Sequence, residues 1–229
     1  MNLTQRLRTI ARHVPKNSIC GDIGTDHGYI PIYLVRNRIC KKVIATDINE
    51  GPIKIAREQI KAAGLEGQIQ TRLGDGLKPL RPGEVDCVVI AGMGGLLIRD
   101  ILKSSEKISR SIDTFILQPM MAQKDLRKYL IENKYTIVDE DLAQEDRRIY
   151  EIIIVKHGQQ RIEDEIYLEI PFTLMQKRHP LLKALIETKK DKLKKIIKQC
   201  EGKKTVNAEN KIEESKKKLL RLEEVEKCL

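Results

Sequence analysis

The fold prediction for this sequence starts from the stretch Cys20-Gly21-Asp22-Ile23-Gly24-Thr25-Asp26-His27-Gly28-Tyr29. Residues 18–22 are typical of a short strand, and the apolar residues 30–35 begin a helical pattern that runs to about residue 36. A glycine turn between a strand and a helix lets the backbone approach a ligand closely, because glycine has no Cβ atom. The start of the helix adds free N–H groups at the same place. The stretch therefore predicts a ligand site at the end of the first strand.

The composition indicates a globular protein with few aromatic side chains. The chain has 229 residues, of which 41% are hydrophobic and only 3% aromatic. Its core must therefore be mainly Ile, Leu and Val, and it offers few stacking surfaces for a nucleobase. Five cysteines form no CxxC pair, which argues against a zinc site or a disulfide framework and suits a reducing compartment. No apolar run reaches about 18 residues, so we expect a cytoplasmic protein without a membrane span and without metal.

Strands and helices alternate between residues 18 and 157. We predict strands over residues 18–22, 42–47, 68–73, 85–91 and 114–118, and helices over residues 52–63, 95–103 and 121–133. This alternation is typical of a mostly parallel, doubly wound α/β sheet. Two further strands over 136–142 and 148–156, joined by the polar stretch 143–147, suit an antiparallel edge. Ligands bind at the carboxyl ends of such parallel strands, which here hold residues 22–28, Asp47, Asp75, 92–95 and 118–120.

Both ends of the chain carry basic helical patterns. Residues 2–14 predict an amphipathic helix whose Arg6 and Arg8 touch RNA phosphates, unless the helix only caps the domain. We predict two domains, a catalytic domain over residues 1–157 and a second domain over residues 158–229. The second domain is predicted to be an antiparallel coiled-coil hairpin of two helices joined at residues 201–205.

The basic charge is concentrated in the first helix of this hairpin. Residues 176–204 hold eleven Lys or Arg and three Asp or Glu, whereas residues 205–229 hold six of each. The first helix is thus either an RNA-binding surface, through Lys194, Lys195 and Lys198, or a solvated face. The net charge of +10 permits a nucleic-acid partner without proving one.

The acidic residues of the glycine turn indicate which ligand it holds. The pattern Asp22-x-Gly24-x-Asp26-x-Gly28 differs from the NAD fingerprint G-x-G-x-x-G. S-adenosylmethionine has no pyrophosphate and carries sulfonium and ammonium cations, which carboxylates suit. The turn therefore favours a methyl donor over NAD.

Three later strand ends agree with a methyl donor. Asp47 can accept hydrogen bonds from ribose hydroxyls, Asp75 can receive the adenine amine, and residues 92–95 bring the backbone near donor and acceptor. Each acid also has a simpler interpretation. Asp47 could cap a helix, Asp75 could be a turn residue, and Asp26 could only brace its own loop. The donor-binding residues that we predict are Asp22, Gly24, Thr25, His27, Gly28, Asp47, Ile48, Asp75, Gly76, Gly92 and Met93.

Several of these segments, taken in order, resemble one family. DIGTDHGYIPIYL, ATDINEGPIKIA, RLGDGL, IAGMGGLLI, LQPM and EDLAQEDRRIYE are similar to the bacterial tRNA adenine-22 N1-methyltransferases, often called TrmK. The resemblance covers the first 157 residues, and the basic hairpin resembles that family's appendage. It implies a class I, Rossmann-like methyltransferase that transfers a methyl group from S-adenosylmethionine to N1 of an adenine in tRNA.

The chemistry of N1 methylation suggests the catalytic residues. The neutral N1 has an in-plane lone pair, so a general base is not obligatory, and a carboxylate would stabilise the cationic product. Asp26 is the main candidate for that role, with Gly92, Met93 and Gln118 placing the base. Tyr29 either stacks on a base or packs into its helix, and His27 either belongs to the donor loop or only bonds the turn. The segment 92–95 lacks the Asn/Asp-Pro-Pro-aromatic motif of N6 methylation.

Two other functions remain open at this point. The chain could methylate a small molecule or a protein, or could bind RNA without catalysis. We expect a monomer.

Overall fold

The structure is a computed structural model that describes residues 3–203, 205–227 and 229. Its contacts divide the chain into two units, the first ending at Ile162 and the second beginning at Glu163. The boundary predicted from composition lies five residues earlier, after His157.

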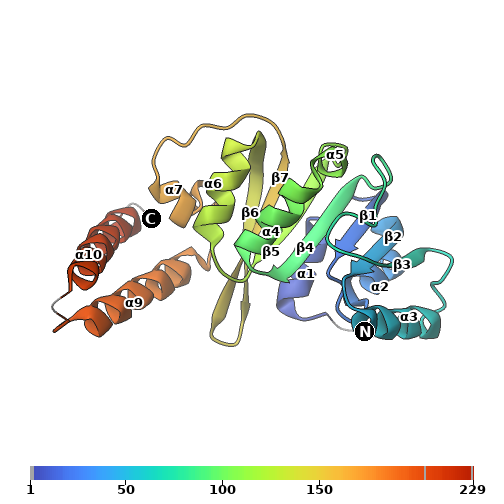
Figure 1. Cartoon of the computed structure of the whole chain (residues 1–229), viewed down its shortest axis with the longest axis horizontal. Coiled ribbons are helices and arrows are strands. Elements are labelled where there is room, and N and C mark those ends of the chain that lie inside the picture. The colour runs from blue at the N-terminus through green and yellow to red at the C-terminus, as the bar shows by residue number, and fades with distance from the viewer. Residues whose placement is uncertain (1–2, 204, 228) are drawn as a thin grey trace. The chain divides into compact units, whose positions relative to one another are not determined.

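The first unit is built on a seven-stranded sheet in the order β3-β2-β1-β4-β5-β7-β6 (Figure 1). Neighbours among the first five strands pair in parallel, while β7 pairs antiparallel with both β5 and the edge strand β6. The predicted, mostly parallel sheet with an antiparallel edge is therefore confirmed. The strands are β1 (Ser18–Ile23), β2 (Cys40–Asp47), β3 (Ile69–Leu73), β4 (Cys87–Met93), β5 (Thr114–Pro119), β6 (Tyr135–Glu145) and β7 (Arg148–His157).

Helices cover both faces of this sheet. One face carries α1 (Gln5–Arg12), α2 (Tyr29–Arg36) and α3 (Glu50–Ala62), and the other carries α4 (Gly95–Ser104), α5 (Glu106–Ser109) and α6 (Gln123–Glu132). Strand β4 shows the alternation, because Val89 faces the first core and Val88 and Ile90 face the second. Burial on both faces explains why this segment has few polar residues.

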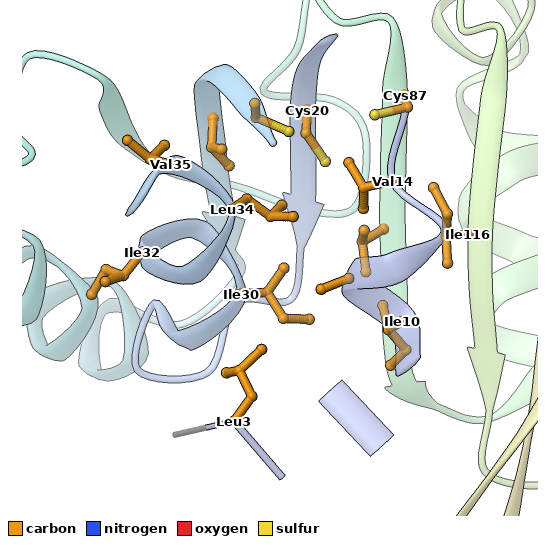
Figure 2. Close-up of a cluster of buried hydrophobic side chains, with 14 of the residues drawn as sticks. Leu3, Ile10, Val14, Cys20, Ile30, Ile32, Leu34, Val35, Cys87 and Ile116 are labelled. Carbon is orange, nitrogen blue, oxygen red and sulfur yellow. The ribbon is translucent and has the colours of Figure 1, made fainter. Parts of the chain in front are cut away.

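The core on the α1 side is made almost entirely of aliphatic side chains. In Figure 2, Ile10 of α1 and Leu34 of α2 lie over Cys20 and Ile116 of the sheet. Each of these four side chains is fully buried. The packing fixes both helices against the sheet and so fixes the glycine turn that precedes α2.

Most predicted strand and helix bounds lie within two residues of the observed ones, and two segments differ by more. Helix α1 is shorter than the predicted range 2–14, because the Thr4 hydroxyl caps it by accepting from Leu7 N at 3.4 Å; Asn2 lies outside the described residues. The stretch 143–147 is not a polar loop, since its first three residues continue β6. Only Asp146 and Arg147 form the turn, and Asp146 has the positive φ of 52° that a tight hairpin requires.

A buried ion triad holds this hairpin against α6. The Arg127 guanidinium donates from Nε to Glu140 Oε1 at 2.8 Å and from Nη2 to Glu151 Oε2 at 2.7 Å. All three side chains are at most 5% exposed. The two carboxylates raise the pKa of Arg127 despite its burial, so the guanidinium stays charged.

The second unit is helical. It contains α7 (Ile166–Glu169), α8 (Phe172–Gln176), α9 (Leu182–Cys200) and α10 (Val206–Lys227), and the last two pack together as the predicted hairpin. The buried Lys190 joins them, since its Nζ lies 2.7 Å from carboxylate oxygens of both Glu187 and Glu226. Lys204, within the predicted joint, lies outside the described residues.

Candidate active site

The glycine turn ties the ends of β1, β2 and β4 together. Gly24 N and Thr25 N both donate to Thr46 O at 2.8 Å. Gly24 has φ of 74°, and a Cβ atom there would lie 2.1 Å from Met93 Cε. Gly28, which precedes α2, has φ of 69° and faces Ala56 of α3. Both glycines are therefore required by backbone geometry, and the first also by close approach.

Asp22 supplies a buried carboxyl directly beneath this turn. It is 5% exposed, and burial raises its pKa to about 6. The carboxylates of Asp47 and Asp26 add to the rise, and the nearby Thr25 hydroxyl opposes it. A carboxyl that is costly to ionise in this way is suited to a cationic ligand, which would restore the charged form.

Asp26, His27 and Tyr29 form a cluster at the outer side of the turn. Asp26 Oδ1 lies 3.1 Å from His27 Nε2, and the Asp26 side chain is 83% exposed. The His27 ring stacks on Tyr29 with centroids 5.3 Å apart. The Tyr29 ring is thus not packed into the protein interior beneath α2. An accessible carboxylate and a stacked aromatic pair stand at the carboxyl edge of the sheet.

The ends of β2 and β3 form the next part of the site. Asp47 Oδ1 accepts from Asn49 N at 2.7 Å, and Asp47 O accepts from Gly74 N at 2.8 Å. The adjacent Ile48 is 63% exposed and provides an apolar surface. Asp75 is also placed here, but its Oδ2 pairs with Lys78 Nζ at 2.6 Å. Gly76 has a positive φ of 54° and lies against Ile101 of α4.

Gln118 holds the end of β4, where the glycine loop of residues 92–95 begins, from inside the protein. Its fully buried side chain accepts at Oε1 from Gly92 N at 3.2 Å and from Arg6 Nη1 at 2.9 Å. Its Nε2 donates to Pro119 O at 3.1 Å. Both ends of the amide are used within the protein, so this geometry supports a positioning role rather than contact with a base edge.

Arg6 joins α1 to this loop and to the β6–β7 hairpin. Its backbone N donates to Glu145 Oε1 at 2.7 Å, and its guanidinium lies 5.4 Å from the centre of the Tyr150 ring. Arg8 turns away, donating from Nη2 to Leu3 O at 3.3 Å. The two arginines predicted to contact RNA therefore differ in their surroundings. Arg6 lies beside Gly92, whereas Arg8 does not share the contacts of Arg6 with the loop and the hairpin.

Comparisons with known proteins agree with this arrangement. A family model described as a methyltransferase domain matches residues 3–153. The tRNA (adenine(22)-N(1))-methyltransferase of Bacillus subtilis strain 168 is 37% identical over 158 residues. The crystal structure of the B. subtilis m1A22 tRNA methyltransferase TrmK is 30% identical, covers 98% of each chain and has a TM-score of 0.88. This chain belongs to the TrmK family.

The extent of these TrmK matches differs between sequence and structure. The sequence match to the B. subtilis enzyme spans 69% of this chain and 66% of that relative, a little under two thirds of its length. The M. capricolum TrmK structure, a complex with S-adenosyl-homocysteine, covers 95% of this chain and 97% of its own, at 31% identity and a TM-score of 0.77. The family resemblance stated from the sequence is confirmed.

Some features of this site were not predicted from the sequence. Glu145 and Tyr150 anchor Arg6, but they lie in a segment that looked like a polar joint and a plain strand. One feature of the sequence could have predicted the contact of Met93 with Gly24, namely a methionine within a glycine run at a strand end. Sequence alone gives no sign that Gln118 is buried.

The remaining predicted residues belong to the second unit of the chain. Lys194, Lys195 and Lys198 are exposed on α9, and Lys194 Nζ lies 4.0 Å from Asp191. Within the described ranges, no helix is long and apolar enough to cross a membrane. The same part of the chain contains no group of three or more His, Cys, Asp or Glu side chains arranged to hold a metal ion.

Proposed function

We propose that this chain transfers the methyl group of S-adenosylmethionine to N1 of adenine 22 in tRNA. The observation that carries the proposal is the TrmK match over both units, together with acids and glycines at successive strand ends. Membership of the family supports the predicted enzyme class, methyl donor and tRNA substrate.

The described residues fit the donor. The buried Asp22, with its raised pKa, suits the ammonium group, and Gly24, Thr25, His27 and Gly28 form the turn beside it. Among the described residues, the Asp47 carboxylate accepts at Oδ1 from Asn49 N, so Oδ2 is available for ribose hydroxyls. Ile48 offers an apolar face to the adenine ring, with Asp75 and Gly76 at its edge. When bound, the donor supplies an electrophilic methyl group on a sulfonium.

We expect the residues that face the adenine to contribute by positioning the base and by stabilising charge. N1 of a neutral adenine needs no base to remove a proton before it attacks. The Asp26 carboxylate, exposed beside His27, stabilises the positive charge that the methylated ring acquires. Gly92 and Met93 bring the backbone next to the glycine turn, and Gln118 fixes that loop. Tyr29 is available to stack on a base.

The tRNA-binding role of α9 is part of the same proposal. Its exposed Lys194, Lys195 and Lys198 match the regular charge of an RNA backbone. In this proposal residues 1–157 carry catalysis and residues 158–229 carry RNA binding. The protein acts as a cytoplasmic monomer without metal; light scattering and elemental analysis of the purified chain test the last two points.

Reverse transcription tests the reaction directly. An N1 methyl group blocks Watson–Crick pairing, so tRNA incubated with enzyme and donor should stop the transcriptase at position 22. Omission of the donor is the control. Label transferred only to a small-metabolite pool would instead support the alternative substrate class. Calorimetry that detects no donor binding at millimolar concentration would support a non-catalytic RNA-binding protein.

A further inference from the structure

Four large apolar side chains are exposed at the carboxyl edge of the sheet, two on a helix and two on a loop. Leu96 and Leu97 lie in the first turn of α4, and Met120 and Met121 lie in the loop that follows β5. They are 45%, 52%, 39% and 66% exposed, respectively. Single exposed apolar residues are ordinary, but four on adjoining segments indicate a binding surface.

The loop after β5 is hydrogen-bonded to the end of β4 and to the start of α4. Gly95 N donates to Met121 O, and Met120 N donates to Met93 O, both at 2.8 Å. A Cβ atom at Gly95 would lie 2.5 Å from Ala122 O, so only glycine permits this approach. The surface is therefore rigidly supported.

Gln118 supports the same surface from beneath. Its Nε2 lies 3.5 Å from the Met120 sulfur, while its Oε1 accepts from Gly92 N. One buried amide thus fixes both the glycine loop and the first methionine. The surface is also continuous with the donor site, because the Met93 side chain reaches across to Gly24.

We propose that Leu96, Leu97, Met120 and Met121 form an apolar platform that receives the target adenine after it leaves the tRNA stack. The inference rests on the proposed function and adds the binding surface for the acceptor base. An extruded purine loses its stacking partners, and apolar contact with its faces offsets part of that loss.

The scarcity of aromatic residues explains why such a platform is aliphatic. The chain has no Trp and two Phe. Phe115 is buried in the core, and Phe172 belongs to the second unit. Thioether side chains are polarisable and adapt their shape, so methionines can pack against a purine ring.

The test places 2-aminopurine, whose fluorescence increases on unstacking, at position 22 of the tRNA. With the full chain and saturating protein, we expect the double variant Leu97→Ser/Met121→Ser to give a severalfold smaller rise than the unaltered chain. On unmodified tRNA its KM should increase roughly tenfold, while its donor affinity by calorimetry stays unchanged. Met121→Leu should retain the signal, because it keeps an apolar surface.

Val138→Ser is the matched control, since Val138 is 45% exposed on the edge strand β6. An unchanged fluorescence rise and KM in the double variant would overturn the platform. The platform would also be overturned if the unaltered chain formed a dimer and the double variant were a monomer, because the surface would then bind a second copy of the chain. Failure of the unaltered chain to stop reverse transcription at position 22 would instead contradict the proposed function.

Discussion

Arg6 of α1 and Gln118 of β5 are joined by a hydrogen bond of 2.9 Å between Nη1 and Oε1. The same oxygen accepts from Gly92 N, so the N-terminal helix is connected through one side chain to the loop beside Met93. Arg6 is also held by Glu145 at the tip of the β6–β7 hairpin. We infer that Arg6 acts through Gln118 as a positioning residue.

Replacing Arg6 tests this role. Arg6→Lys keeps the charge but loses the planar fork that spans Gln118 and Tyr150. We expect kcat to fall about tenfold, the cost of one charge-assisted hydrogen bond, with donor affinity unchanged. Steady-state kinetics and calorimetry measure the two effects, and Arg12→Lys, exposed on the same helix, is the control. A change confined to the KM and salt dependence for tRNA would show direct RNA contact instead.

Gly24→Ala tests the close approach of β1 and β4. Both the positive φ and the 2.1 Å contact with Met93 Cε oppose a Cβ atom there. Gly83→Ala is the matched control, because Gly83 has φ of 73° with open space around it. Both variants should lose about 1 kcal/mol of unfolding free energy. Only Gly24→Ala should also weaken donor binding, by about tenfold or more on calorimetry, because Met93 must move. Equal donor affinity in the two variants would contradict the argument.

The pKa of Asp22 predicts a pH dependence of stability. Burial raises it from 3.8 to about 6, so between these values the folded chain binds a proton that the unfolded chain has lost. The stabilisation is complete below about pH 4 and disappears as pH rises through 6. The contribution of Asp22 to unfolding free energy should therefore fall by about 3 kcal/mol across that window.

Asp22→Asn isolates this effect. It should be more stable than the unaltered chain at pH 7.5, and the difference should vanish near pH 4. Denaturant titrations at several pH values measure it, with the exposed Asp113→Asn as control. Donor affinity of the unaltered chain should rise from pH 5 to pH 7 as Asp22 ionises, and Asp22→Asn should lack that rise. A parallel rise in Asp22→Asn would exclude Asp22 as its source.

The parts of the fold that depend on local patterns were predictable. Alternating strand and helix periods indicated the doubly wound sheet, and the Asp22-to-Gly28 pattern indicated the turn, because backbone demands on glycine are local. The hairpin joint was predicted wrongly because two of its three strand residues, Gln144 and Glu145, are polar. That polarity has a structural reason in Glu145, which binds Arg6 from 139 positions away.

Long-range pairings left no such local signal. Glu140 and Glu151 belong to a segment that resembled the family, yet their partner Arg127 lies on α6 and is revealed only by the packed sheet. Likewise, the sequence identified Gln118 as a strand-end residue but not as a buried one. Its role depends on Arg6, which lies 112 residues away.

The lysines of α9 allow a test of RNA binding that does not depend on the catalytic unit. Replacing Lys194, Lys195 and Lys198 with Gln removes three exposed charges. If each contacts a phosphate, the slope of log affinity against log salt should decrease by about 2. Replacing residues 216–218, three exposed lysines of α10, with Gln removes the same charge and is the control. Because residues 205–229 carry equal numbers of basic and acidic side chains, we expect the control variant to keep most of the salt dependence of tRNA binding. Equal slopes in the two variants would mean that α9 contributes only general charge.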